Sequence, residues 1–149
     1  MSQHSAPPTP AEALAAALSA EYAAIFAYGP IGVRLSGSAR TAARQAEAAH
    51  RRRRDALVVQ LSTAGATVPP DQAGYTLPFP ITDRASALRL AIEVEERTAA
   101  HWRAALAATS GSDRDQALDA LVDYAVQATR WRRTAKITPL TVPFPGRPT

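Results

Sequence analysis

Apolar residues recur with the spacing of an α-helix in four stretches of this chain, and glycine, proline or serine separates the stretches. Residues three and four positions apart share one face of a helix, so this spacing is typical of helices that pack together. The pattern predicts helices over residues 10–28, 37–63, 83–109 and 113–133. Alanine is abundant and aromatic residues make up 6% of the chain, which favours an all-α bundle over a β-sandwich.

Local signals mark both ends of the first helix. Thr9 can cap it, Pro10 suits its first position, and Glu12 completes a capping box. Gly29 and Pro30 stand seventeen and eighteen residues after Glu12. Because proline lacks an N–H group and its ring clashes with the preceding turn, we expect the helix to end just before this pair.

The connection between the second and third helices is long and rich in proline and glycine. Residues 65–82, GATVPPDQAGYTLPFPIT, are not expected to be helical. Such a long link is explained if the two helices run parallel, because the chain must then return along the whole bundle. A four-helix bundle with one long crossover is the ferritin-like topology. An up-down bundle with a loose loop is the alternative.

The helices divide the chain into three segments. We expect a disordered N-terminal arm over residues 1–9, a bundle over 10–136 and an extended proline-rich strap over 137–149. The crossover and the strap each contain a Pro-Phe-Pro sequence. We expect the phenylalanines of these sequences, Phe79 and Phe144, to pin the two segments to the bundle.

Composition excludes several kinds of site and partner. The chain has no cysteine, which rules out disulfides, Cys-ligated zinc and iron–sulfur clusters. We find no signal-peptide pattern and no window of 18 uncharged apolar residues, so we expect a cytoplasmic protein without a membrane partner. The net charge of +4 rests on sixteen arginines and one lysine. A high-GC coding bias produces that ratio without selection for guanidinium chemistry, and nucleic acid is not an expected partner.

Two of the predicted helices carry a glutamate on their apolar face. In the first helix the inward positions are Leu14, Leu18, Glu21, Ile25 and Tyr28. In the third helix they are Leu88, Ile92, Glu95, Ala99, Trp102 and Leu106. An unpaired carboxylate in a core is costly, so Glu21 and Glu95 must each find a cation, a metal ion or a proton.

The second helix adds a Glu-x-x-His pair, Glu47 and His50, within the stretch AEAAHRRRRDAL. Residues three apart on a helix lie one above the other and can share a metal ion. The ferritin-like di-iron pattern needs two such pairs and two further glutamates, and the fourth helix has no pair to give. The set Glu21, Glu47, His50 and Glu95 is therefore predicted to bind one iron or manganese ion. No nucleotide or organic cofactor is indicated.

Four segments carry a resemblance to a known family. They are AEYAAIFAYGPIGVRL (20–35), HRRRRDAL (50–57), YTLPFPITDRASALRLA (75–91) and PFPGRP (143–148). In combination they resemble the ferritin-like domain of unknown function that is widespread in high-GC Gram-positive bacteria. The resemblance implies a ferritin-like bundle over about residues 12–147. It implies neither ferroxidase activity nor iron storage, since the family has no assigned reaction.

An alternative interpretation needs no metal. Arg54 lies one turn beyond His50, so buried arginine–glutamate ion pairs could satisfy the carboxylates of a relic site. The chain would then be a non-catalytic helical interaction module that forms a homodimer. The run Arg51–Arg54 spreads around the helix, so its four side chains cannot all face one ligand. Whether the protein is an enzyme is left open by the sequence.

Overall fold

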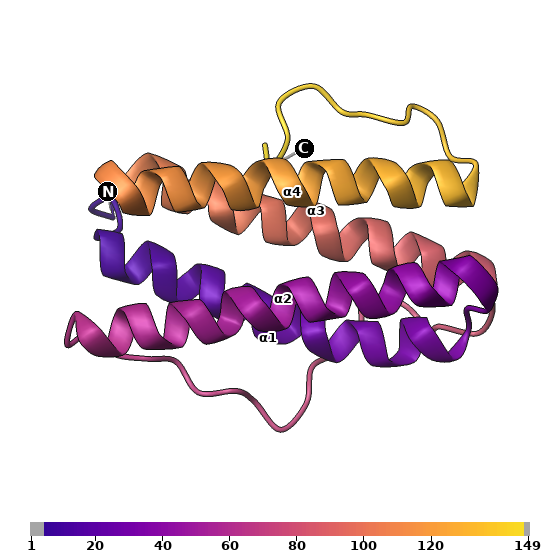
Figure 1. Cartoon of the computed structure of the whole chain (residues 1–149), viewed down its shortest axis with the longest axis horizontal. Helices are drawn as coiled ribbons and strands as arrows, with labels where there is room; N and C mark the ends of the chain where they lie inside the picture. The colour runs from indigo at the N-terminus through magenta and orange to yellow at the C-terminus, as the bar shows by residue number, and fades with distance from the viewer. Residues whose placement is uncertain (1–4, 148–149) are drawn as a thin grey trace.

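The computed structural model describes residues 5–147 and has four long helices and no strand over that range (Figure 1). The helices are α1 (Pro10–Val33), α2 (Gly37–Thr63), α3 (Arg84–Ala108) and α4 (Gly111–Ala135). The predicted all-α four-helix bundle is thus confirmed. Residues 1–4 of the predicted arm, with His4, lie outside the described residues, as do residues 148–149 of the strap.

The helices form two hairpins that pack side by side. α1 packs against α2 and α3, and α3 packs against α4, whereas α2 and α4 approach each other less closely. α2 and α3 run in the same direction, and residues 64–83 return along the outside of the bundle between them (Figure 1). The weaker approach of α2 to α4 leaves a groove on that side of the molecule.

The first helix is longer than its sequence predicts. Pro30 lies inside α1, which continues to Val33. The missing N–H group and the clash with the preceding turn disfavour this continuation. The next turn buries Ile31 completely and leads to the buried Leu35, and this apolar burial compensates for the lost hydrogen bond. The prediction that the helix ends before the Gly-Pro pair is therefore wrong.

α1 is long and apolar enough to cross a membrane by length and composition alone. In the structure one face of α1, with Leu14, Leu18 and Ile31, packs into the bundle core, whereas Phe26 and Val33 are exposed. Its single mid-helix carboxylate, Glu21, also points into that core and is fully buried. The core helix of a bundle meets the same length and composition test.

The hydrophobic core consists of two clusters, one in each half of the bundle. One contains Tyr28, Ile31, Leu90 and Trp131, and the other contains Leu18, Leu57, Trp102 and Tyr124. Most of the remaining members are alanines. Small side chains let helix backbones approach closely, so the layer between the two clusters is densely enclosed.

The two non-helical segments are held in different ways. Phe79 of the crossover is partly buried against the bundle, and the Arg89 guanidinium lies 4.8 Å from its ring centre. Phe144 of the strap is 63% exposed, so the prediction that it pins the strap is wrong. The adjacent Gly146 lies against the α3 backbone instead.

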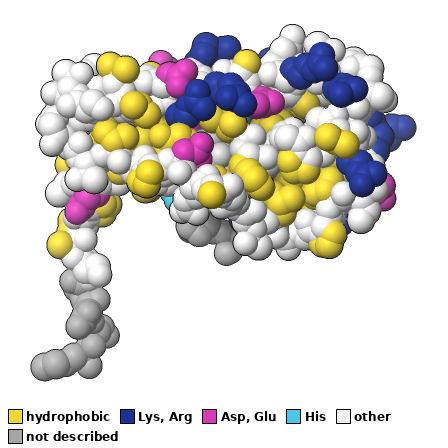
Figure 2. Space-filling model, turned by 90° about the horizontal axis from the view of Figure 1, so that it is seen from below, with side chains coloured by type: hydrophobic (Ala, Val, Ile, Leu, Met, Phe, Trp, Pro, Cys, Tyr) yellow, Lys and Arg dark blue, Asp and Glu magenta, His cyan; other side chains and the backbone are white. Residues whose placement is uncertain are grey.

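Basic side chains do not form one continuous patch on the face seen in Figure 2. They lie there in several separate groups, with hydrophobic side chains between them. Several arginines are paired with acids, including Arg53 with Asp123 and Arg132 with Glu96.

The N-cap of α1 offers a stability test. Thr9 accepts a hydrogen bond from the Glu12 N–H at 3.2 Å, and the Glu12 carboxylate accepts one from the Thr9 N–H at 2.8 Å. We expect Thr9→Ala to lower the free energy of unfolding by about 1 kcal/mol, measured by urea denaturation. Ser36, the N-cap of α2, makes no side-chain cap bond. Ser36→Ala is the matched control, and an equal loss in both variants would contradict the capping role of Thr9.

Candidate functional site

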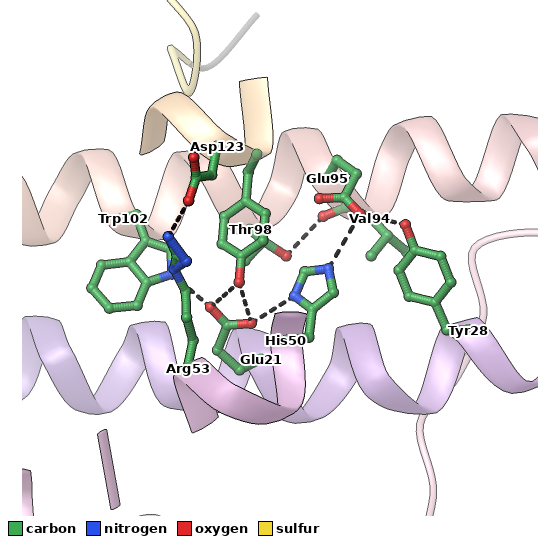
Figure 3. A network of polar contacts seen from close by, with 10 residues as sticks. Glu21, Tyr28, His50, Arg53, Val94, Glu95, Thr98, Trp102 and Asp123 are labelled. Carbon is green, nitrogen blue, oxygen red and sulfur yellow. Dashed lines mark hydrogen bonds and ion pairs between the residues drawn. The ribbon is translucent and has the colours of Figure 1, made fainter. Parts of the chain in front are cut away.

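A polar centre lies between the two hydrophobic clusters, halfway along the bundle (Figure 3). Its charged members are Glu21 from α1, His50 from α2 and Glu95 from α3, and none of them is exposed to solvent. Each helix presents its residue because the neighbouring inward positions are apolar and must be buried. The structure therefore brings together three of the four predicted ligands.

The imidazole of His50 lies between the two carboxylates (Figure 3). Its Nδ1 atom is 2.6 Å from Glu21 Oε2, and its Nε2 atom is 3.2 Å from Glu95 Oε1. The two ring nitrogens point away from each other, so each carboxylate contacts its own side of the ring. His50 therefore bridges Glu21 and Glu95 through its two ring nitrogens, and the carboxylates do not converge on one point.

Glu21 is completely satisfied by hydrogen-bond donors. The Trp102 indole N–H donates to Oε1 at 2.7 Å. The Tyr124 hydroxyl lies 2.7 Å from Oε1 and 2.8 Å from Oε2, and His50 completes the set. Such a group of donors satisfies the hydrogen-bonding capacity of a carboxylate within a core.

Glu95 is satisfied on only one of its two oxygens. Oε1 accepts a hydrogen bond from the Tyr28 hydroxyl and another from His50 Nε2. The Trp131 indole N–H donates a hydrogen bond to the Tyr28 hydroxyl at 2.9 Å. Oε2 is buried and has no partner among the described residues. Buried polar atoms in native proteins nearly always have a partner, so this oxygen marks a place for a water molecule, an ion or a ligand.

Electrostatics keep the imidazole positively charged. Burial by itself lowers the pKa of His50, but the charge of Glu95 and the hydrogen bonds and charge of Glu21 outweigh it and raise the pKa to about 9. Burial and the nearby carboxylates also raise the pKa of Tyr28 and Tyr124, so both phenols stay neutral donors. The centre is a protonated imidazole held between two acids.

A groove between α2 and α4 reaches this centre. It has a volume of about 350 Å³, and Glu95, Tyr124 and Trp131 line it together with residues nearer the surface. Arg53 of α2 spans it to Asp123 of α4 at 2.5 Å, and its guanidinium lies 5.1 Å from the centre of the Tyr124 ring. Glu95 thus lines a groove that opens toward solvent.

Glu47, the fourth predicted ligand, is not part of the centre. Its carboxylate pairs with Arg51 at 2.6 Å on the outside of α2. The inward positions of this helix are Ala43, Ala46 and His50, so alanine takes the place that the prediction gave to Glu47. A helix with 3.6 residues per turn can place either Ala46 or Glu47 near His50 on its inward face. The small apolar side chain of Ala46 packs inside, and the Glu47 carboxylate remains near water.

The alternative prediction of buried arginine–glutamate pairs is also wrong. Arg54 pairs with Asp55 at 2.8 Å, and Arg53 pairs with Asp123. Within residues 5–147 no arginine forms an ion pair with Glu21 or Glu95. Histidine, phenol and indole groups satisfy the carboxylates instead, which avoids burying the large arginine side chain.

Tyr124 and Trp131 of α4 are members of the centre that helical spacing did not predict. The sequence contains one signal that points to them. A buried tyrosine or tryptophan usually finds an acceptor for its O–H or N–H group. The inward Glu95 of the third helix is such an acceptor. α4 therefore contributes hydrogen-bond donors where the metal pattern would place an acid.

The donor set does not form a complete metal site as it stands. Among residues 5–147, no three His, Asp or Glu side chains are placed to hold one ion. Glu21 and Glu95 contact opposite nitrogens of His50, so they cannot share an ion without rearrangement. The pair that can converge is His50 Nε2 with Glu95, whose second oxygen is free.

Comparison with known proteins identifies similar chains but no activity. A family model described as a domain of unknown function (DUF4439) matches residues 13–149. The crystal structure of a conserved hypothetical protein from Mycobacterium tuberculosis is 40% identical, covering 82% of this chain and 93% of that one, with a TM-score of 0.79. No curated protein matches. The predicted homodimer and cytoplasmic location stay predictions.

The protonated imidazole predicts a specific dependence of stability on pH. In the unfolded chain His50 loses its proton near pH 6.5, whereas the folded protein keeps it until about pH 9. The folded state then binds more protons, so the free energy of unfolding should fall as pH rises through this window, by about 3 kcal/mol. Urea denaturation of EDTA-treated protein measures this change between about pH 6 and 9.5. This range spans the pKa values of His50 in the unfolded and the folded chain.

Two variants separate this effect from other histidines. His50→Gln should remove the slope. His101→Gln should keep it, because burial lowers the pKa of His101 and moves its contribution below pH 6.5. A wild-type stability that stays constant over the window would show that the buried imidazole is neutral.

The hydrogen bonds to Glu21 can be tested at Tyr124. Tyr124→Phe removes the hydroxyl that donates to both carboxylate oxygens, and we expect it to lower the free energy of unfolding by about 1–3 kcal/mol. Tyr22 is the matched control, since it packs against the same cluster and its hydroxyl makes no hydrogen bond within residues 5–147. Thermal denaturation that gives equal losses for Tyr124→Phe and Tyr22→Phe would show that only packing matters.

Proposed function

This chain belongs to the DUF4439 family, which is described only as a domain of unknown function, so we propose a function from the geometry of its buried centre. We propose that the protein binds a single iron or manganese ion at His50 and Glu95, from the side of the groove between α2 and α4. Imidazole nitrogen and carboxylate oxygen are ligands that suit these metals.

One observation carries this proposal. Glu95 Oε2 is buried without a partner, and the same carboxylate lies 3.2 Å from His50 Nε2 through its other oxygen. A cation beside the free oxygen would satisfy an acceptor that is otherwise expensive to bury. The groove lined by Glu95 provides the route by which an ion and its water ligands could enter.

Glu21 has a supporting role in this proposal. Histidine ligands of metals usually donate their second ring N–H to a carboxylate, which fixes the tautomer and the orientation of the ring. His50 Nδ1 has such a partner in Glu21 at 2.6 Å, leaving Nε2 on the side of Glu95. Trp102 and Tyr124 in turn hold Glu21 in place.

The proposal uses fewer residues than the sequence suggests. Of Glu21, Glu47, His50 and Glu95, it makes only His50 and Glu95 direct ligands. It excludes Glu47, whose carboxylate is paired with Arg51 at the surface. A bound iron or manganese ion would supply Lewis acidity or one-electron chemistry beside the groove. The wider proposal that the bundle is ferritin-like is supported by its single long crossover.

Metal binding must compete with the proton on His50. The pKa of this imidazole is raised to about 9, and a metal can bind only to the neutral nitrogen. Binding should therefore release a proton and become tighter as the pH rises from 6.5 toward 9. A surface site made of carboxylates alone would show no such dependence in this range.

Titration with Mn²⁺, followed by electron paramagnetic resonance and by calorimetry, tests the proposal. We expect one ion per chain in the wild type. His50→Ala and Glu95→Gln should each weaken binding at least about tenfold, and Glu21→Gln by about 10- to 100-fold through loss of ring orientation. Elemental analysis of protein from cells supplied with iron and manganese gives the native metal content.

Glu47→Gln is the matched control, because Glu47 is a carboxylate on the same helix outside the centre. It should leave binding unchanged. If Glu47→Gln weakens Mn²⁺ binding as much as Glu95→Gln does, the predicted four-ligand site forms by rearrangement. If the wild type binds no Mn²⁺ up to roughly millimolar concentration at pH 8.5, where affinity is high enough for most protein sites, the centre is a purely structural network.

A further inference from the structure

The strap encloses a second cavity, on the opposite side of α4 from the groove. Residues 137–147 leave the end of α4 and fold back along the outside of the bundle (Figure 1). Between this segment, α3 and α4 lies a cavity of about 340 Å³, which we call the strap crevice. Its principal apolar lining residues are Ala99, Leu121, Val122, Ala125, Val126, Leu140 and Val142.

The strap is held at both ends by polar and backbone contacts. Arg132 donates a hydrogen bond to the Pro139 carbonyl at 3.1 Å, and Arg103 donates one to the Pro145 carbonyl at 3.1 Å. At Gly146, which has φ +75°, an added Cβ would lie 2.7 Å from the Ala99 carbonyl oxygen. The strap thus approaches α3 as closely as a backbone can, and this contact requires glycine.

Between these anchors the strap does not fill the space beneath it. Leu140 is 37% exposed and Val142 is 38% exposed, and on α4 Val122 and Val126 are 52% and 44% exposed. Aliphatic side chains that line a cavity lose dispersion contacts and remain partly hydrated. An apolar molecule that filled the crevice would remove this lining from water and so lower the free energy of the protein.

Charge at the crevice favours an uncharged occupant. The charged side chains in its wall are Glu96 and Arg132, which pair with each other at 2.5 Å. The third nitrogen of the Arg132 guanidinium, Nη1, donates to the Pro139 carbonyl. The wall therefore offers neither a free cation nor a free anion to a ligand, and an ionised head group would gain no partner there.

Size favours a small molecule over a protein segment. Ligand pockets typically have volumes of about 300–1,000 Å³, so the crevice lies at the small end of this range. The anchored strap forms one wall, and a partner helix about 10 Å across would have to displace it. We propose that the strap crevice, whose apolar lining is aliphatic, binds the aliphatic chain of a small uncharged molecule, independently of the buried centre.

A series of straight-chain alcohols from butanol to dodecanol tests this proposal on the full-length protein. Binding is measured by the chemical shifts of methyl groups in labelled protein. We expect the affinity to rise about fourfold per added methylene and then to level off when the crevice is full. The largest shifts should be those of Val122, Val126 and Ala125. An affinity that rises without a plateau, or shifts located elsewhere, would overturn the proposal.

Variants identify the crevice as the site. Ala125→Phe should fill it and weaken octanol binding at least tenfold. Val122→Asp, at a half-exposed position that tolerates charge, should do the same and keeps the test valid if the phenylalanine variant fails to fold. Gly146→Val should weaken binding by displacing the strap. Leu118→Ala is the control, because Leu118 is exposed on the same helix and does not line the crevice, so binding should be unchanged.

Two outcomes would replace the proposal with another. If Val122→Asp leaves octanol binding intact, the crevice is not the site. If the protein dimerises and Val122→Asp abolishes the dimer, this apolar surface serves a second copy of the chain rather than a small molecule. Analytical ultracentrifugation over a range of concentrations separates these cases from binding by a monomer.

Discussion

The rest of this structure depends on the pairing of two carboxylates with one imidazole inside an otherwise apolar bundle. Glu21 and Glu95 are fully buried, and the charge of His50 and the surrounding N–H and O–H donors offset the cost of burying their polar groups. Each helix contributes at least one member of this centre. The network therefore fixes the register of all four helices, because a shift of one helix would leave a buried charge unpaired.

The centre also explains how the two halves of the core are built. Tyr28 and Trp131 belong to one hydrophobic cluster, and Trp102 and Tyr124 belong to the other, yet all four side chains direct a polar group toward the layer between the clusters. Large amphipathic aromatics can satisfy a carboxylate while their rings fill the apolar core. Only Glu95 Oε2 is left without a partner in the part of the chain that the structure describes.

The helices were predictable because their signals are local. The capping box of Thr9 and Glu12 and the apolar spacing of each stretch depend on residues within a few turns of one another. The predicted end of α1 failed because Pro30 is a local breaker, whereas the burial of Ile31 is a tertiary effect. The prediction that Glu47 faces the core was wrong for a related reason. Periodicity allowed either Glu47 or the preceding alanine to face inward, and packing against the neighbouring helices chose the alanine.

The sequence by itself determined that this protein is a four-helix bundle with Glu21, His50 and Glu95 directed toward its core. These features follow from helical periodicity and from the cost of exposing apolar faces to water. Only the tertiary structure decided how the three side chains meet. The imidazole separates the carboxylates, Tyr124 and Trp131 supply donors from the fourth helix, and Glu95 lines a groove. Those relations depend on distances between helices, and periodicity within one helix carries no information about them.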